Sequence, residues 1–405
     1  MSVITLFCNR FCHEEPVTQA LTAITGHLLI TDDMVSARAS ELSGIKKSKL
    51  INAFSSRTSV FNSFTHEKEC SMAYMRLALA KLLEDKSVIV SGYTGFLIPN
   101  TLDPLLRVCL TANTQFRQAL AKNEENISED ELFQVFLLEA KDASAWTDLL
   151  FSIKDPWNPI LYDIVISMDQ STPDKAAARI FENLLTQPCK PTKTAETKIK
   201  DFLLAADTEV ALVNAGHNVD VQADNGNIIL TINKQILMLT RLEDELKSIA
   251  GTVPGVLSVE TRMGQPAAPP IPIYRKHHIE LPSKVLLVDD EKEFVQTLSE
   301  RLQMRNMGSV VAYDGQSALD LVQNDAPEVM IIDLKMPGID GMEILKQVKQ
   351  TRPEIEVIVL TGHGSEHDKK KCLDLGAFAY MQKPADISLL SEALKKAHEK
   401  VKTGK

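Results

Sequence analysis

The sequence predicts an α/β protein with parallel sheets, and two stretches carry this prediction. Near the C-terminus, Val285–Val288 is a run of four apolar residues, as in a strand covered on both faces of a parallel sheet. Near the N-terminus, Val3–Phe7 has a similar character, and it is followed by Val17, Leu21 and Ile24 at helical spacing. Strands therefore alternate with helices at both ends of the chain.

Two proline-bearing stretches divide the 405 residues into three expected domains. Gln187–Thr194 is polar, and Gly264–Pro272 is rich in proline, which makes a linker extended and semi-rigid. The expected domains are therefore residues 1–187, 195–263 and 282–405.

Composition excludes several classes of function. The net charge of −10 and the lack of a long basic run argue against nucleic acid as a partner. No apolar stretch has the length of a membrane span or of a secretion signal, so we expect a cytoplasmic protein. Six cysteines are scattered over the chain, as expected of reduced thiols rather than of a disulfide framework.

The first domain alternates strands and helices, which predicts a parallel sheet. Strands are expected at Val3–Phe7, Ser87–Gly92, Leu106–Thr111 and Tyr162–Ser167. Helices are expected around Val17–Ile24, at Ser36–Leu42 and Met72–Leu83, from the capping box at Ser128, and at Pro173–Leu185.

Three pieces of this domain give it a family resemblance: Ile30–Asp33 before a helix, Val88–Gly92, and the segment from Asp155 to Ile166. In this order they resemble the cytidylate-kinase-like family of P-loop nucleoside monophosphate kinases. The resemblance implies a P-loop-kinase-like fold and a nucleotide kinase ancestry.

The phosphate-binding loop of such kinases is missing. A kinase needs glycines after the first strand, so that backbone N–H groups can approach the phosphates. Here Cys8–Pro16 has no glycine, and Glu14 and Glu15 occupy the helix start, where they would repel a triphosphate. The lid region 115–134 keeps only Arg117 of the phosphate-clamping arginines.

We therefore expect the first domain to be inactive, serving as a sensory or protein-interaction output. Two alternatives remain: a cytidylate kinase gated by the C-terminal domain, and a sensor that keeps a nucleoside pocket. Arg10 and Arg107 could be plain surface cations. Cys8, Cys12 and His13 could suggest a metal site, but a core thiol with two loop residues is the expected reading, because no fourth ligand is evident.

The middle domain has the expected order αββαβ. Its elements are a helix at Ala195–Ala206, strands at Asn218–Ala223 and Ile228–Ile232, a helix at Lys234–Ile249, and the segment Val253–Val259, which turns into a last strand. The Asn225-Gly226 turn and Pro254–Val256 resemble the BON domain. No chemical constellation is present here, so a spacer or dimerising module is expected.

The C-terminal domain has polar side chains at four strand ends. Asp289 and Asp290 follow the strand at 285–288, Asp333 follows Val329–Ile332, Thr361 follows Val357–Leu360, and Lys383 follows Phe378–Met381. Ligands of open α/β sheets bind at the carboxyl ends of the strands. Carboxylates suit Mg²⁺, and a lysine suits a phosphoryl group. The sequence therefore predicts one cleft for phosphoryl chemistry.

This constellation, with Asp333–Gly341 (DLKMPGIDG) and Thr361–Gly364 (TGHG), resembles the receiver domain of two-component response regulators. The resemblance implies a flavodoxin-like (βα)5 fold. It also implies that Asp333 accepts a phosphoryl group from a histidine kinase or phosphotransfer protein. The roles that it implies for the other residues are Mg²⁺ ligation by Asp289, Asp290, Asp333 and the Lys335 carbonyl, phosphoryl binding by Thr361 and Lys383, and an aromatic switch at Tyr380.

The expected function is thus phosphorylation-dependent signalling by a two-component response regulator that is not itself an enzyme. We expect no DNA-binding domain after the last helix, Asp386–Lys400, so the output would be an unknown downstream protein. A homodimer is left open.

Overall fold

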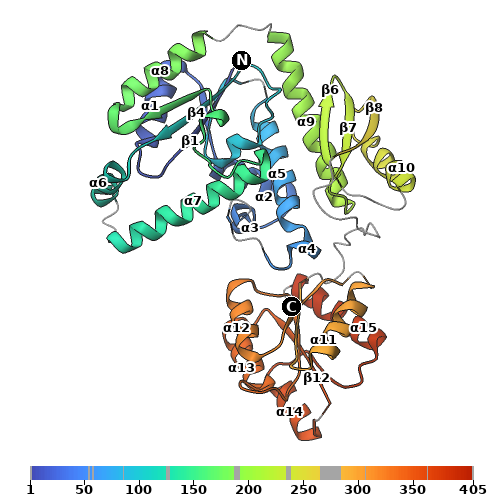
Figure 1. The fold of residues 1–405 in the computed structure, drawn as a ribbon. Helices are drawn as coiled ribbons and strands as arrows, with labels where there is room; N and C mark the ends of the chain where they lie inside the picture. Colours follow the sequence, from blue (N-terminus) through green and yellow to red (C-terminus); the bar gives the residue numbers. More distant parts are fainter. Residues whose placement is uncertain are drawn as a thin grey trace. The chain divides into compact units, whose positions relative to one another are not determined.

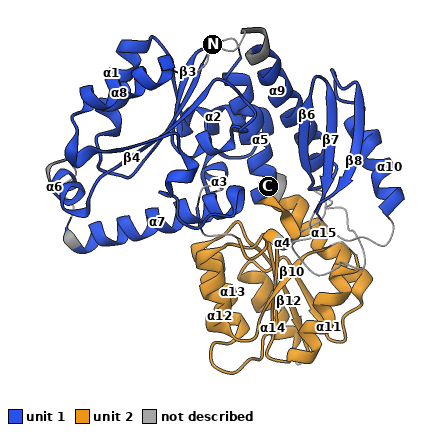
Figure 2. Ribbon diagram, turned by 45° about the horizontal axis from the view of Figure 1, so that its top comes forward, with its two compact units in different colours: residues 1–58, 68–273 blue, residues 59–67, 274–405 orange. Residues whose placement is uncertain are grey.

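The computed structural model describes residues 2–52, 55–56, 59–84, 86–124, 128–186, 192–233, 239–264, 284–305, 307–362 and 364–403. The chain forms two compact units (Figure 2). The first unit comprises residues 1–58 and 68–273, and the second comprises residues 59–67 and 274–405. Within the described ranges, no helix has both the length and the apolar character needed to cross a membrane.

A parallel five-stranded sheet forms the centre of the first unit (Figure 1). Its strands are β1 (Val3–Cys8), β2 (Leu28–Thr31), β3 (Val88–Ser91), β4 (Leu105–Thr111) and β5 (Ile164–Ser167). The order is β2-β3-β1-β4-β5, and every neighbouring pair is parallel. This confirms the predicted parallel α/β architecture. We did not predict β2, which has only four residues, because so short an apolar run does not distinguish a strand from a helix.

Helices cover both faces of this sheet. They are α1 (Glu14–Thr25), α2 (Asp32–Ser43), α3 (Lys47–Asn52), α5 (Glu67–Leu82), α6 (Thr114–Glu124), α7 (Glu129–Phe151) and α8 (Pro173–Thr186). On one face, α1 and α8 pack over Ile4 and Leu6 of β1. Helix α2 begins four residues before the predicted Ser36, because the Thr31 hydroxyl accepts a hydrogen bond from the backbone N–H of Met34 and caps the helix.

The remainder of the first unit has the predicted order αββαβ. Its elements are α9 (Thr192–Asn214), β6 (Asp220–Asp224), β7 (Asn227–Ile232), α10 (Leu239–Ala250) and β8 (Ser258–Met263). As predicted, Val253–Val259 turns into the last strand, which starts at Ser258 after a turn with Gly255 at φ +95°. Helix α9 starts at Thr192, inside the predicted linker 187–194; residues 187–191, 234–238 and 265–283 lie outside the described part of the chain.

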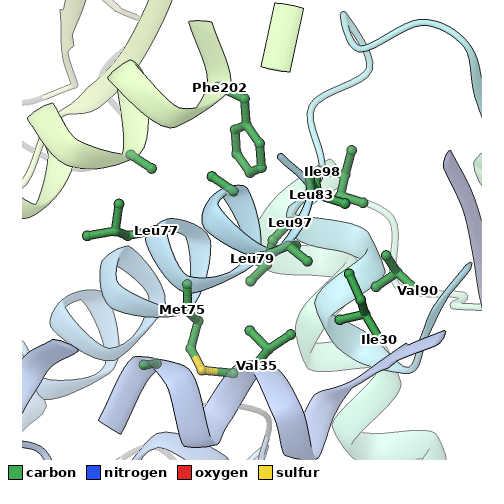
Figure 3. Close-up of a cluster of buried hydrophobic side chains, with 14 of the residues drawn as sticks. Ile30, Val35, Met75, Leu77, Leu79, Leu83, Val90, Leu97, Ile98 and Phe202 are labelled. Atoms are coloured by element: carbon green, nitrogen blue, oxygen red, sulfur yellow. The ribbon is translucent and has the colours of Figure 1, made fainter. Parts of the chain in front are cut away.

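Helix α9 packs into the core of the preceding part of the first unit, residues 2–186, which we call the kinase-like segment. Phe202 and Ile199 belong to the same buried cluster as Leu77 and Leu79 of α5 and Val90 of β3. Figure 3 shows the Phe202 ring projecting from α9 toward the side chains of α5. The two segments therefore share a core, and a domain boundary between residues 187 and 195 stays a prediction.

The second unit contains another parallel five-stranded sheet. Its strands are β9 (Val285–Val288), β10 (Ser309–Ala312), β11 (Val329–Ile332), β12 (Glu356–Thr361) and β13 (Ala379–Gln382), in the order β10-β9-β11-β12-β13. Its helices are α4 (Asn62–Thr65), α11 (Lys292–Gln303), α12 (Gly315–Asn324), α13 (Gly341–Thr351), α14 (Glu366–Asp374) and α15 (Ile387–Thr403). This strand order is the flavodoxin-like one that we predicted.

The two faces of this second sheet have separate cores. Helices α11 and α15 supply Leu298 and Leu394 to one face, and α12 and α13 supply Val322 and Ile344 to the other. The four residues of β9 are all buried, as expected for a strand covered on both sides. Because hydrophobic side chains fill both faces of the sheet, the polar residues at the strand ends lie at its edges.

The shared core of the first unit can be tested with Phe202→Ala. Deleting a buried phenylalanine ring costs about 3–5 kcal/mol of unfolding free energy, and Phe202 is only 7% exposed. Both tryptophans, Trp146 and Trp157, lie in the first unit, so chemical unfolding followed by tryptophan fluorescence reports on that unit. The matched control Phe133→Ala, at a side chain that is 64% exposed, should change stability by no more than about 0.5 kcal/mol. Equal effects of the two variants would contradict the shared core.

Candidate functional site

Three carboxylates meet at the carboxyl edge of the second sheet. Asp289 and Asp290 follow β9 and Asp333 follows β11, and these two strands are neighbours in the sheet. One ligand oxygen from each of the three residues lies within 4.8 Å of the other two. Asp289 and Asp333 are buried and Asp290 is exposed. The strand order thus brings together the acids that the sequence predicts at one site.

Lys383, just after β13, reaches into this carboxylate cluster. Its Nζ lies 2.7 Å from Asp289 Oδ2, 3.1 Å from Glu291 Oε1 and 3.6 Å from Asp333 Oδ2. The ammonium also lies 4.4 Å from the centroid of the Phe294 ring. The lysine is therefore held over the acids by charge on one side and by an aromatic face on the other.

The electrostatics of this cluster follow from burial and close charges. Burial raises the pKa of Asp289, although its hydrogen bond to Lys383 opposes that shift. For Lys383, burial lowers the pKa, but Asp289 and Glu291 outweigh burial and raise it overall. The lysine therefore stays charged at neutral pH. One ammonium cannot neutralise three carboxylates, so the cluster favours a further cation.

The two oxygens of Asp333 have different surroundings. Oδ1 accepts a hydrogen bond of 2.8 Å from the backbone N–H of Leu334, and Oδ2 lies on the side of Lys383. The loop beyond Asp333 packs tightly, because a Cβ at Gly341 would lie 1.9 Å from the Asp333 carbonyl oxygen. Asp340 then caps α13 by accepting the backbone N–H of Glu343. This glycine and this aspartate explain the end of the sequence motif 333–341.

Thr361 and Tyr380 lie on the next two strands. Thr361 ends β12 and is buried, and its carbonyl accepts the backbone N–H of Lys383 at 2.9 Å, which ties the ends of β12 and β13 together. The Tyr380 hydroxyl is buried without a hydrogen-bond partner among the described residues. A Cβ at Gly364 would lie 1.5 Å from that hydroxyl. Glycine at 364 is therefore what leaves room for the inward position of Tyr380.

Sequence reasoning missed two contributors to this site. Glu291 had no predicted role, yet its carboxylate pairs with Lys383. The run of three consecutive acids at 289–291 was the available signal. Gly364 was named only as part of a motif, and its packing against Tyr380 could not be seen without the fold. Lys335 lies two residues after Asp333, and its carbonyl remains the predicted fourth oxygen ligand.

In the first unit, the loop between β1 and α1 is closed by side chains. Glu139 of α7 accepts the backbone N–H of Arg10 at 2.6 Å and also pairs with the Arg117 guanidinium. Arg117 Nε donates to the Arg10 carbonyl at 2.8 Å, and its guanidinium lies 4.0 Å from the centroid of the Phe136 ring. The lid arginine is therefore bound within a buried ion pair. Burial raises the pKa of Glu139, and Arg117 opposes that shift.

The remaining residues of this loop have unusual backbone angles and side-chain hydrogen bonds. Phe11 and His13 have φ values of 58° and 60°, a region that glycine occupies more readily. Glu14 accepts a hydrogen bond from the Ser91 hydroxyl at the end of β3, so its carboxylate lies at the sheet edge. The Cys12 thiol donates to the Asn9 carbonyl. In the described part of the chain, the only cluster suited to a metal is Asp289, Asp290 and Asp333.

Arg107 is also engaged. Its Nη2 donates to the Ile98 carbonyl and to Asn100 Oδ1, at 2.7 Å each, and its guanidinium faces the Phe151 ring. Burial lowers the pKa of Arg107. Arg107 thus fixes the loop before β4.

Two family models match this chain. The response regulator receiver domain matches residues 285–395, and the cytidylate kinase-like family matches residues 3–170. Residues 285–395 are therefore a response regulator receiver domain, and a cytidylate kinase-like domain precedes it. This confirms both resemblances, whereas the BON-like resemblance of residues 195–263 stays a prediction.

Curated relatives match through the receiver domain. The transcriptional regulatory protein CpxR of Escherichia coli (strain K12) is 38% identical over 120 residues, which are 29% of this chain and 51% of CpxR. The response regulator MprA of Mycolicibacterium vanbaalenii is 34% identical over 104 residues, which are 26% of this chain and 45% of MprA. The chain thus spans about half the length of the relatives it matches.

Among solved structures, the receiver domain of the Francisella response regulator 1452 is 30% identical. The match covers 29% of this chain and 98% of that domain, with a TM-score of 0.28.

The carboxylate cluster can be tested by Mg²⁺ titration. Removing Asp290 deletes one of three clustered carboxylates, and even changes beside a metal ligand cost about tenfold or more in affinity. Isothermal titration calorimetry of the full chain should therefore show Mg²⁺ binding at least about tenfold weaker for Asp290→Ala. Asp374→Ala, which removes an exposed acid outside the cluster, is the matched control and should keep wild-type affinity. Unchanged affinity in Asp290→Ala would count against this metal site.

Proposed function

We propose that this chain is a two-component response regulator that accepts a phosphoryl group on Asp333 from a histidine kinase or a phosphotransfer protein. The observation that carries the proposal is the cluster of Asp289, Asp290 and Asp333 under the ammonium of Lys383. The match of residues 285–395 to receiver domains supports it independently.

The arrangement suits transfer from a phosphohistidine. An Asp333 carboxylate oxygen would attack the phosphorus, the phosphorus–nitrogen bond would break, and its electron pair would return to the imidazole. Oδ2 is the expected nucleophile, because Oδ1 is held by the Leu334 N–H. Lys383 and the hydroxyl of Thr361 would bind the phosphoryl oxygens, as charge neutralisation and positioning dominate such reactions.

The same cluster fits Mg²⁺. Magnesium prefers oxygen ligands and keeps several waters, so three carboxylates and the Lys335 carbonyl suffice. When bound, the ion neutralises charge on the transferring phosphoryl group. Lys383 pairs with Asp289 and Glu291 in the unphosphorylated receiver. It can shift towards a phosphorylated Asp333, whose acyl phosphate carries about −1.5 to −2 charges in place of the single charge of the carboxylate. Tyr380, packed against Gly364, would report that change at the surface.

For the cytidylate kinase-like domain, we propose an output or sensory role without catalysis. Support comes from the loop after β1, where Glu14 lies at the sheet edge and Glu139 holds the Arg10 amide. A cavity in the same unit is lined by Asp32, Asp33 and Asp142, among others. Carboxylates at a pocket wall repel phosphates. A protein partner is therefore a better candidate for this domain than a nucleoside phosphate.

The second candidate is a cytidylate kinase gated by the receiver. The family match over residues 3–170 favours it, because this match covers most of the kinase-like segment. The ion pair between Arg117 and Glu139 argues against kinase activity, since a phosphate-clamping arginine must be free to reach its substrate. A nucleoside sensor is intermediate between the two, and saturable binding of cytidine by the full chain would favour it.

Phosphorylation of the receiver is tested with acetyl phosphate and Mg²⁺. The wild-type chain should take up one phosphoryl group per receiver, detected as a mass shift of intact protein, and Asp333→Asn should take up none, because an amide is not a nucleophile towards phosphorus. Asp374→Ala is the matched control on the surface of the same domain. Uptake of one equivalent by the Asp333→Asn receiver would refute the assignment of the acceptor.

Kinase activity of the N-terminal domain is tested with CMP or dCMP and ATP. We expect no ADP production above background that depends on CMP or dCMP, because the closed loop cannot present its N–H groups to phosphates. Glu14→Gly combined with Glu15→Lys should not restore turnover, because Arg117 stays paired with Glu139. An authentic CMP kinase serves as the positive control. Steady CMP-dependent turnover by the wild-type chain, with or without phosphorylation, would establish the alternative function.

A further inference from the structure

A short segment from the N-terminal half of the sequence packs against the receiver. Residues 59–67, which include α4, belong to the second unit together with residues 274–405 (Figure 2). Phe61 is fully buried, and it belongs to the same hydrophobic cluster as Leu286 of β9, Met330 of β11 and Val322 of α12. The segment thus contributes to one of the two cores of the receiver.

Polar contacts hold the same segment. The backbone N–H of Val60 donates to Asp325 Oδ2 at 2.7 Å. The Nζ of Lys284 lies 2.6 Å from Glu67 Oε2, and the lysine side chain is only 9% exposed. An ion pair with one largely buried partner adds orientation to the apolar contact made by Phe61.

The receiver provides space for a second aromatic ring. A Cβ at Gly308 would lie 2.2 Å from Phe64 Cβ, so glycine is the residue that lets Phe64 approach the chain there. Two aromatic side chains, one ion pair and one backbone hydrogen bond therefore fit a single stretch of nine residues.

This contact lies at the opposite edge of the sheet from the phosphorylation cleft. Lys284 precedes β9, Gly308 precedes β10 and Asp325 lies between α12 and β11, so all three are at the amino ends of strands. Asp289 and Asp333 are at the carboxyl ends of β9 and β11. The strands between the two edges have four residues each and therefore span roughly 13 Å.

We propose that the amino edge of the receiver sheet, formed by Lys284, Gly308 and Asp325, is a docking surface for residues 59–67 of the same chain. The receiver is then joined to the preceding part of the chain in two ways. The first is the covalent connection before β9, and the second is the non-covalent contact made by Phe61 and Phe64. Because the docking surface is remote from Asp333, the attachment persists while a phosphodonor protein occupies the cleft. The inference holds whichever reaction the receiver performs.

Zero-length cross-linking of the full chain tests this docking. A carbodiimide joins a lysine amine to a carboxylate only when the two are in contact, so a Lys284–Glu67 cross-link should be found by mass spectrometry. Phe61→Asp should abolish it, because a buried charge would expel the segment. Phe133→Asp, at a phenylalanine that is 64% exposed, is the matched control and should retain the cross-link. Gly308→Val is a second disruptive variant, acting from the receiver side.

Each outcome decides the proposal. Absence of the wild-type cross-link, or wild-type yield in both disruptive variants, overturns it. Mixed-isotope cross-links after mixing labelled and unlabelled protein would assign the segment to a second copy and overturn docking within one chain. Loss of the cross-link with beryllofluoride would overturn its independence of phosphorylation. Acetyl phosphate uptake should equal wild type in Phe61→Asp, which shows a folded receiver and separates this test from that of Asp333.

Discussion

The proximity of Asp289, Asp290 and Asp333 is the constraint that the fold of the second unit has to satisfy. Carboxylates this close repel one another, and two of the three are buried, so the cluster exists only because the surrounding fold holds it. The strand order places β9 beside β11, and Lys383 reaches the cluster from β13. Hydrophobic packing on both sheet faces supplies the stabilisation that offsets the repulsion. A bound cation, or a phosphoryl group together with its metal ion, would reduce the remaining repulsion between the carboxylates.

Much of this site was predictable because it obeys a local rule. Apolar runs marked the strands, the residue after each run marked the edge, and parallel pairing gathered the edges, which is why Asp333, Thr361 and Lys383 could be named in advance. Glu291 and Gly364 escaped prediction, because their roles depend on side chains distant in sequence. Strand β2 escaped for a different reason: its apolar run is too short to show a strand or helix period.

Tertiary packing also involves residues that the sequence places in or near linkers. Residues 192–214 form one helix because Phe202 and Ile199 find a core in the kinase-like segment, a contact that no linker composition could reveal. Phe61 likewise lies in a short segment without clear periodicity, yet it is buried within the receiver's core cluster. Linker signals in a sequence describe local flexibility, whereas compact units are set by which apolar side chains find partners.

The ion pair of Arg117 and Glu139 has a consequence for the history of the kinase-like domain. Both side chains are buried, and Glu139 also accepts the Arg10 amide. A substitution of either residue alone would leave the other charge, or a backbone N–H, without its partner in a low-dielectric interior. Such pairs change together or hardly at all. A lineage that acquired this pair would therefore find the way back to an open phosphate loop obstructed by destabilised intermediates, even where each separate change favoured nucleotide binding.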